Sequence, residues 1–280
     1  LTGETKYKEF DFEYLAGGSI FYSDDDNLNA STNGGISVPG FFSIKASVTP
    51  ASINQSTQAQ QVNSIFGRVG VSWKKLIYVD VTGRNDWSST LSKAQRSYFY
   101  PSIASSFVVS ELLPGTKSWL DLLKLRNSWT VSKKPANIYE INSSYVLNNG
   151  IWKTLIWATA PSLLYPAGLT PQASNTFETG LQAIFFKIRL NVDIAYYDKR
   201  NYDGIISGPI TAASGYTGIK TNTREETKNR GWEVILGGTP VKSKNWQWDL
   251  GINWSTYKQI YWKLDSVFSA KQPWVKVGGR

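Results

Sequence analysis

The side chains that most often carry chemistry in proteins are scarce in this sequence. Its 280 residues include no histidine, cysteine or methionine. Disulfides, thiol chemistry and zinc sites built on cysteine and histidine are therefore excluded from this chain, and serine-hydrolase triads of the usual kind lack their base. Glu225 and Glu226 are adjacent, and adjacent side chains of a strand point to opposite faces, so they do not converge as a carboxylate pair. We expect neither enzyme activity nor a cofactor.

An acidic run at residues 24–26 is the strongest candidate for a metal site. Asp25, Asn27 and Asn29 alternate along the chain in the way that the oxygen ligands of calcium-binding loops do. However, Ala30 occupies the position where the tight turn of such a loop takes glycine, and no glutamate closes the loop. We therefore expect a solvated loop and no bound metal.

Four polar and aromatic residues follow one of the predicted strands in a pattern that suits ligand contacts. Asn85, Asp86 and Trp87, with Arg96 further along, bring an amide, a carboxylate, an indole and a guanidinium to the point where a strand enters a long connection. Binding residues concentrate in loops that a rigid scaffold positions. We predict that these four residues contact a polar substrate. The alternative is a hydrogen-bond network that only orders the connection.

Tryptophan is unusually frequent, with 12 copies, and several of these residues alternate with polar ones. Trp246, Trp248 and Trp254 fall at alternate positions of one segment, so their side chains share a face of a strand. A platform for stacking sugar rings is one interpretation of such a face. We favour a girdle of aromatic side chains at a membrane interface, and assign Tyr196 and Trp232 to the same girdle.

Apolar and polar residues alternate with a period of two along much of the chain, which predicts strands. The clearest segments are 188–198 and 246–256, and others lie around 9–14, 64–73 and 123–131. The first two are longer than the roughly five or six residues of an average strand in a soluble protein. No apolar run of about 18 residues occurs, so a membrane-spanning helix is not expected.

The connections between these segments differ at the two ends of the strands. Short turns are predicted at 74–75, 185–187 and 242–245, and long connections, some containing extra strand, at about 17–63, 85–97, 132–175 and 199–229. Short turns at one end and long loops at the other are typical of outer-membrane barrels. We predict an all-β chain that forms an antiparallel transmembrane β-barrel, with the four long connections outside the cell. A soluble all-β carbohydrate-binding module or propeller is the alternative.

The charge pattern argues against nucleic acid as a partner. The 30 basic and 21 acidic residues leave a net charge of +9, but the basic residues are scattered singly along strands and turns, whereas nucleic-acid sites cluster them. The chain begins with Leu1 and contains no methionine. We therefore expect a segment of a longer protein.

The segment from Phe66 to Trp87 resembles the barrel of SusC/RagA-like TonB-dependent outer-membrane transporters. The similarity extends over about residues 64–256 and includes the stretches 96–102, 123–129, 169–181, 189–197, 229–233 and 248–255. Two places depart from the pattern of that family. Pro171-Gln172 stands where the family usually has Pro-Glu, and residues 131–137 replace a glycine-rich stretch. These departures concern loop detail.

The resemblance implies a barrel of about twenty-two strands with an internal plug. Residues 1–280 would be a single segment of that barrel, with the plug domain outside this chain. It also implies TonB-energised import of an oligosaccharide or oligopeptide across the outer membrane of a Gram-negative, Bacteroidota-type bacterium. The implied partners are outer-membrane lipid, a SusD-like lipoprotein lid, and TonB, which would act through the missing N-terminal part. The resemblance is also compatible with a dimer of transporter–lipoprotein pairs. A siderophore or cobalamin transporter, which lacks the lid, is the rival within the barrel class.

Overall fold

Most of the described chain lies in strands, which turns and longer connections join. The computed structural model describes residues 1–152, 155–267 and 276–279, and in this part the chain forms sixteen strands and four 3₁₀ segments. The strands are β1 (Thr2–Tyr7), β2 (Phe10–Ile36), β3 (Ser47–Trp73), β4 (Ile77–Ser88), β5 (Ser97–Val108), β6 (Leu120–Lys134), β7 (Val146–Trp152), β8 (Leu155–Thr159), β9 (Leu163–Leu164), β10 (Gln172–Phe185), β11 (Leu190–Tyr202), β12 (Ile205–Pro209), β13 (Gly218–Asn222), β14 (Glu226–Lys242), β15 (Gln247–Ser255) and β16 (Lys258–Lys263). The 3₁₀ segments are η1 (Ile44–Ala46), η2 (Val109–Leu112), η3 (Pro114–Thr116) and η4 (Ala212–Ser214). The prediction of an all-β chain is confirmed.

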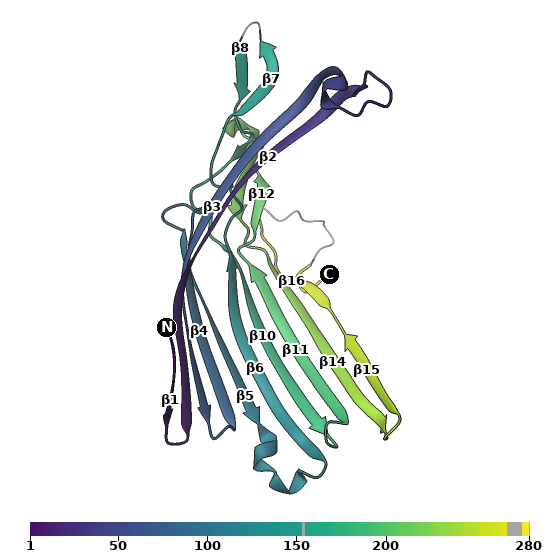
Figure 1. Ribbon diagram of the computed structural model, residues 1–280. Helices are drawn as coiled ribbons and strands as arrows, with labels where there is room; N and C mark the ends of the chain where they lie inside the picture. Colours follow the sequence, from purple (N-terminus) through teal and green to yellow (C-terminus); the bar gives the residue numbers. More distant parts are fainter. Residues whose placement is uncertain (153–154, 268–275, 280) are drawn as a thin grey trace.

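Eleven of these strands form one antiparallel sheet, which curves like a section of a barrel wall (Figure 1). Its order is β1-β2-β3-β4-β5-β6-β10-β11-β14-β15, and β16 pairs with β14 beyond the end of β15. Over the residues that the structure describes, the edge strands β1 and β15 do not pair with each other, so the wall is open. The predicted partial, antiparallel barrel is the fold observed.

Short turns join consecutive strands at one end of this wall, called here the turn end. The chain passes from β3 to β4 through Lys74 and Lys75, both with φ above +50°, the left-handed conformation that tight hairpins require. Phe186 and Lys187 have the same conformation between β10 and β11. The predicted short turns at 74–75, 185–187 and 242–245 fall at these hairpins and at the β14–β15 turn. The opposite end is called the loop end.

The longest strands lie in a region expected to be a connection with some extra strand, residues 17–63. They are β2 and β3, of 27 residues each, which pair from Phe10↔Trp73 to Ile36↔Ser47. Beyond Val62↔Ser88 the strand β4 no longer accompanies β3, so two strands alone project from the wall (Figure 1). Their outer halves are mostly polar on both faces, so the sequence carries no regular apolar alternation there to indicate strand. The acidic run at residues 24–26, expected in a solvated loop, lies in β2.

The other long connections lie at the loop end, from which the β7–β8 hairpin projects (Figure 1). Residues 89–96 join β4 to β5, 135–171 contain β7, β8 and β9, and 203–225 contain β12 and β13. β12, β13 and β9 form a small three-stranded sheet. A compact apolar cluster joins the connections, made of Leu91, Tyr98 and Ala136 with Tyr100 and Ile205 packed against it. The cluster therefore packs parts of the three connections against the beginning of β5.

One face of the wall is apolar and uncovered. Val69, Val81, Ile103, Trp129 and Phe177 are direct neighbours across five strands, and residues opposite one another in paired strands point to the same face. Each of the five is 36% to 51% exposed. A row of large apolar side chains without a protein cover indicates contact with lipid. No helix among the described residues is long and apolar enough to cross a membrane.

The opposite face is polar, and its side chains reach across more than one strand. Arg126 of β6 extends over Gly180 of β10 to Asp193 of β11, and donates two hydrogen bonds of 2.7 Å to its carboxylate. A Cβ atom on Gly180 would lie 2.7 Å from Nε of Arg126, so glycine leaves the space that this ion pair occupies. Convergence of side chains over two strands is expected on the inner face of a barrel wall.

A charge placed on the apolar face tests this assignment. Leu181 lies between Leu125 and Ile194 on that face. We expect Leu181→Arg to lower the free energy of unfolding in lipid vesicles by about 2–4 kcal/mol, the cost of arginine facing the middle of a bilayer. Urea titration of the membrane-inserted protein measures it.

The matched control is Gln182→Arg, one residue along the same strand. Gln182 lies between Lys124 and Asp193 on the polar face, where a cation remains hydrated and has a carboxylate beside it. We expect at most a small loss of stability from this variant. Equal losses from the two variants would contradict the assignment of faces.

Candidate functional site

The structure divides the four residues predicted to contact a substrate between two faces. Asn85 lies opposite Ile65 and Phe99, and Trp87 follows two residues later, so both point to the apolar side. Asp86 points to the polar face. Arg96 is exposed in the connection before β5, and its backbone carbonyl accepts a hydrogen bond from Ser88. The four side chains therefore do not converge, because the period of two separates consecutive residues.

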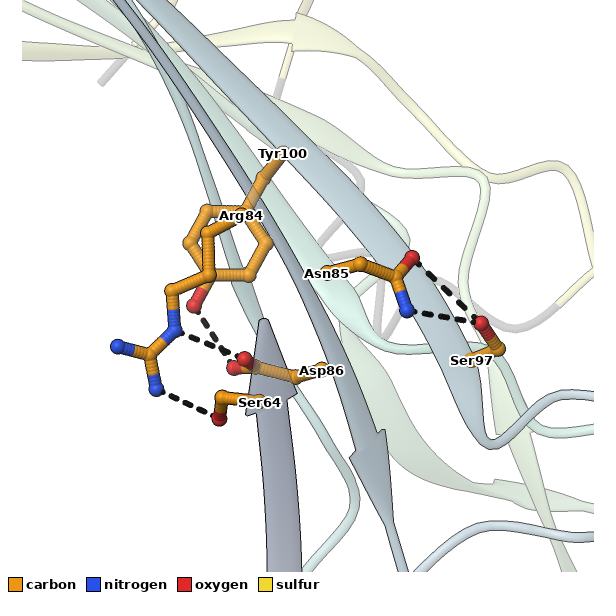
Figure 2. A network of polar contacts seen from close by, with 6 residues as sticks. All are labelled: Ser64, Arg84, Asn85, Asp86, Ser97 and Tyr100. Atoms are coloured by element: carbon orange, nitrogen blue, oxygen red, sulfur yellow. Dashed lines mark hydrogen bonds and ion pairs between the residues drawn. The ribbon is translucent and has the colours of Figure 1, made fainter. Parts of the chain in front are cut away.

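Asp86 is held in a hydrogen-bond network that joins β3, β4 and β5 (Figure 2). Its carboxylate accepts a 2.8 Å bond from Nε of Arg84 and a 2.7 Å bond from the Tyr100 hydroxyl. Arg84 also donates to Oγ of Ser64 at 2.8 Å. The Asp86 side chain is only 8% exposed. These contacts are those of a network that orders the end of the strands.

Asn85 has its own partner on the other side of β4 (Figure 2). Its side-chain amide donates to Oγ of Ser97 at 3.1 Å. This contact joins β4 to β5 at the point where β5 begins. Contact of Asn85, Asp86, Trp87 and Arg96 with a substrate stays a prediction, and the geometry directs only Asp86 of the three β4 residues toward the polar face.

The residues predicted to form an aromatic girdle gather on the apolar face. Tyr196 and Trp232 face each other across β11 and β14 with ring centroids 5.0 Å apart. Trp254 lies opposite Val234, and Trp248 opposite Val241. Trp246 immediately precedes β15 and is 77% exposed. Contact of these rings with lipid stays a prediction.

The apolar face ends next to Tyr196 and Trp232, on their side nearer the loop end. Asp198 and Arg230 are the next residues of β11 and β14 on the same face, and Nε of Arg230 donates to the Asp198 carboxylate at 2.7 Å. Arg200 follows, and donates to Glu226 at 2.7 Å. A change from aliphatic to aromatic to charged side chains along one face is the profile of a membrane boundary.

A cavity that the sequence analysis did not identify lies at the loop end. It has a volume of about 530 Å³, and lies among the ends of β6, β10, β11 and β14, with part of β12 over it. The lining residues are Ser132, Lys133, Lys134, Gln172, Ala173, Ser174, Lys199, Asn201, Tyr202, Gly204, Ile205, Ile206, Thr223, Glu225 and Thr227. Most of these carry hydroxyl, amide or charged groups, so the cavity suits a hydrophilic ligand.

Strand pairing assembles this cavity from segments far apart in the sequence. Ser132, Ser174, Asn201 and Thr227 form one row across four strands, and all belong to the polar face. Asn201 donates to Oγ1 of Thr227 at 3.1 Å. Each also has a polar neighbour in the sequence, as Arg200 is beside Asn201 and Lys228 beside Thr227, so local alternation does not single these residues out. The sequence does not show which segments are neighbours, and for that reason the row was missed.

An ion pair ties two of the long connections together beside this region. Nζ of Lys220, in β13, lies 2.8 Å from the carboxylate of Glu140, and both side chains are less than 20% exposed. Burial alone would raise the pKa of Glu140, but hydrogen bonds from Lys220 and from the backbone N–H of Asn137 outweigh it and lower that pKa. The connection after β6 is thereby fastened to the small sheet.

The Asp86 network gives a prediction about stability. We expect Asp86→Ala to lower the free energy of unfolding by roughly 1–3 kcal/mol, because Arg84 and Tyr100 lose their acceptor. The loss stays below that of a fully buried pair because the Arg84 side chain is 40% exposed. Urea unfolding in detergent micelles measures it.

Ligand affinity, measured on the same variants, separates the two roles of Asp86. Val81→Ala, on the opposite face of β4, is the control for a change in the same strand. If Asp86→Ala weakens binding of a transported ligand without lowering the free energy of unfolding, Asp86 contacts the ligand. In that case the network does not depend on the Asp86 carboxylate.

The Glu140–Lys220 pair gives a pH dependence. The pKa of Glu140 is lower in the folded chain than in the unfolded one, so the pair's contribution is present above the unfolded pKa and is lost as pH falls through the folded value. We expect exchange of the backbone amide hydrogens in residues 135–142, corrected for intrinsic rates, to become faster as the pH falls through the pKa of Glu140 in the folded chain. Glu140→Gln should show fast exchange at neutral pH already. A variant that exchanges like the wild type at every pH would contradict this role.

Comparison with known proteins gives the same picture as the geometry. The family model described as "TonB dependent receptor-like, beta-barrel" matches residues 2–278. TonB-dependent receptor P26 of Formosa agariphila is 29% identical over 217 residues, which cover 74% of this chain and 21% of that protein. TonB-dependent receptor SusC of Bacteroides thetaiotaomicron is 25% identical over 198 residues, 68% of this chain and 20% of that protein. The chain thus spans about a fifth of the length of these curated relatives.

Solved structures share the fold. A chain of the RagAB peptide transporter superposes with a TM-score of 0.83 at 21% identity, covering 95% of this chain and 30% of its own length. The outer membrane transporter YddB from Escherichia coli superposes with a TM-score of 0.59 at 14% identity, covering 92% of this chain and 32% of its own length. At these identities the likeness concerns the fold alone.

Proposed function

The chain belongs to the TonB dependent receptor-like β-barrel family, and from that membership we propose that it forms part of the wall of a SusC/RagA-type importer in the bacterial outer membrane. The cargo we propose is an oligosaccharide or an oligopeptide. The observation that carries the proposal is the division of one continuous sheet into an uncovered apolar face and a polar face. Such a wall separates lipid from a water-filled lumen, through which a hydrophilic oligomer passes without any bond being changed.

The two ends of the wall would face different compartments. The turn end lies in the periplasm and the loop end outside the cell, as in barrels with short turns at one end and long loops at the other. The projecting β2–β3 hairpin and the connections 89–96, 135–171 and 203–225 would then surround the external mouth. This orientation supports cargo entry at the loop end, where the polar cavity lies.

The proposed partners follow from the SusC/RagA resemblance. A SusD-like lipoprotein would cover the loop end and hold cargo over the lumen, and TonB would act through a part of the transporter outside this chain. Two such pairs would associate as a dimer. The similarity to TonB-dependent receptor SusC, together with the fold shared with the RagAB peptide transporter, supports the SusC/RagA type over a siderophore or cobalamin transporter. Energy input would shift the conformational equilibrium of the plug toward release.

A substrate contact is proposed for the residues at the end of β4. Asp86 would act from the polar face, and Arg96 from the connection above it, where it is exposed. Asn85 and Trp87 would contribute only through loops that fold around the outer edge, since both point to the apolar side. A soluble carbohydrate-binding module is disfavoured because it would leave the row from Val69 to Phe177 in water.

Native purification tests the proposal. The full-length protein, tagged and extracted from outer membranes in mild detergent, should co-purify with a surface lipoprotein. Uptake of the cargo by cells should stop when the proton-motive force is dissipated, since TonB depends on it. A protein that remains monodisperse in buffer without detergent would contradict both the barrel and the transport proposal.

A further inference from the structure

The polar cavity at the loop end differs in charge from the rest of the polar face. Elsewhere on that face the arginines are neutralised by carboxylates, as in the pairs Arg68–Asp80, Arg84–Asp86 and Arg126–Asp193. The charged residues that line the cavity are three lysines and a single glutamate. The cavity therefore has an excess of positive charge, which attracts anions into a concave site.

Two of the lysines belong to the polar face and lack an acidic partner. Lys134 lies opposite Gln172, and Lys199 opposite Thr176, both polar-face positions of β10. Across the part of the chain that the structure describes, neither lysine makes an ion pair. No carboxylate of the described chain neutralises these two ammonium groups, so both are available to a ligand.

The register sets the distance between the two lysines. Gln172 and Thr176 are four residues apart on β10, and Lys134 and Lys199 stand on the strands at either side. Strand geometry places their α carbons about 16 Å apart. A single small anion does not span this separation, whereas two acidic groups a few units apart on one oligomer do.

The space between the lysines is lined with groups that bind uncharged parts of an oligomer. The row of Ser132, Ser174, Asn201 and Thr227 crosses the cavity on the same face. Its hydroxyl and amide groups both donate and accept hydrogen bonds. They suit either the hydroxyls of a sugar or the backbone of a peptide.

We propose that this cavity is a cargo subsite for acidic oligomers, with Lys134 and Lys199 each binding one carboxylate or sulfate of the same molecule. The proposal rests on the proposed import function and specifies its cargo by charge. The cavity lies where cargo would enter the lumen. It would therefore select acidic oligomers at the mouth, before they pass the neutralised ion pairs deeper on the polar face.

The test measures binding to the full-length transporter with its co-purified lipoprotein in detergent. Hexagalacturonate and hexaglutamate are the acidic probes, and maltohexaose and hexaglutamine are their neutral counterparts. We expect one acidic probe to bind at least roughly tenfold more tightly than its neutral counterpart, and the affinity to fall with added salt. Which acidic probe binds distinguishes a sugar cargo from a peptide cargo.

The double variant Lys134→Gln with Lys199→Gln should lose most of that preference while keeping any affinity for the neutral probe. Lys75→Gln, in the β3–β4 turn at the opposite end of the wall, is the matched control for loss of a lysine. Wild-type binding without preference for an acidic probe, or a preference that survives the double variant, overturns the proposal. Normal membrane insertion and lipoprotein co-purification in those cases would show that the import function stands and only the subsite fails.

Discussion

The structure depends on one constraint: every backbone N–H and C=O group of a membrane-spanning strand must be paired within the sheet, because the bilayer interior offers no water to bond. Antiparallel pairing from β1 to β15, with a few register shifts, meets this constraint for the strands between the two edges. It also fixes the direction of every side chain, since a strand under continuous pairing alternates its residues between two faces. The proposed lipid contact, lumen chemistry and aromatic girdle all follow from that alternation.

The two faces solve different physical problems. The apolar face needs large apolar side chains up to the membrane boundary, which we propose lies at Tyr196 and Trp232, next to the Arg230–Asp198 pair. The polar face must hold charges close together where side chains converge. It does so by pairing them and by placing Gly180 under Arg126. At the loop end the positive charges outnumber the negative ones, because three lysines and one glutamate line the cavity.

The sequence predicted the fold wherever apolar alternation was strong. The segments 188–198 and 246–256 correspond to β11 (Leu190–Tyr202) and β15 (Gln247–Ser255). The sequence does not indicate continuous strand in the outer halves of β2 and β3, because strands that leave the bilayer need no apolar face. The long connections hid which strands are neighbours, and with that the row of Ser132, Ser174, Asn201 and Thr227 that builds the cavity.

The predicted site shows a second limit of sequence reasoning. Asn85, Asp86 and Trp87 were grouped because they are consecutive, yet the same alternation that identified the strand sends the first and third away from the second. The hydrogen bonds among Asp86, Arg84, Tyr100 and Ser64 depend on the alignment of β3, β4 and β5. No local pattern in the sequence contains that alignment.

The most direct test of the two-faced wall is a spin-label scan along β14. Cysteine, which this chain lacks, would be introduced singly at Trp232, Glu233, Val234, Ile235 and Leu236 of the full-length protein in lipid vesicles. Accessibility would be measured to oxygen, which concentrates in lipid, and to a water-soluble nickel chelate. Labels at 232, 234 and 236 should favour oxygen, and those at 233 and 235 the chelate. Accessibility without a period of two, or access of the chelate to all five positions, would contradict a wall between lipid and lumen.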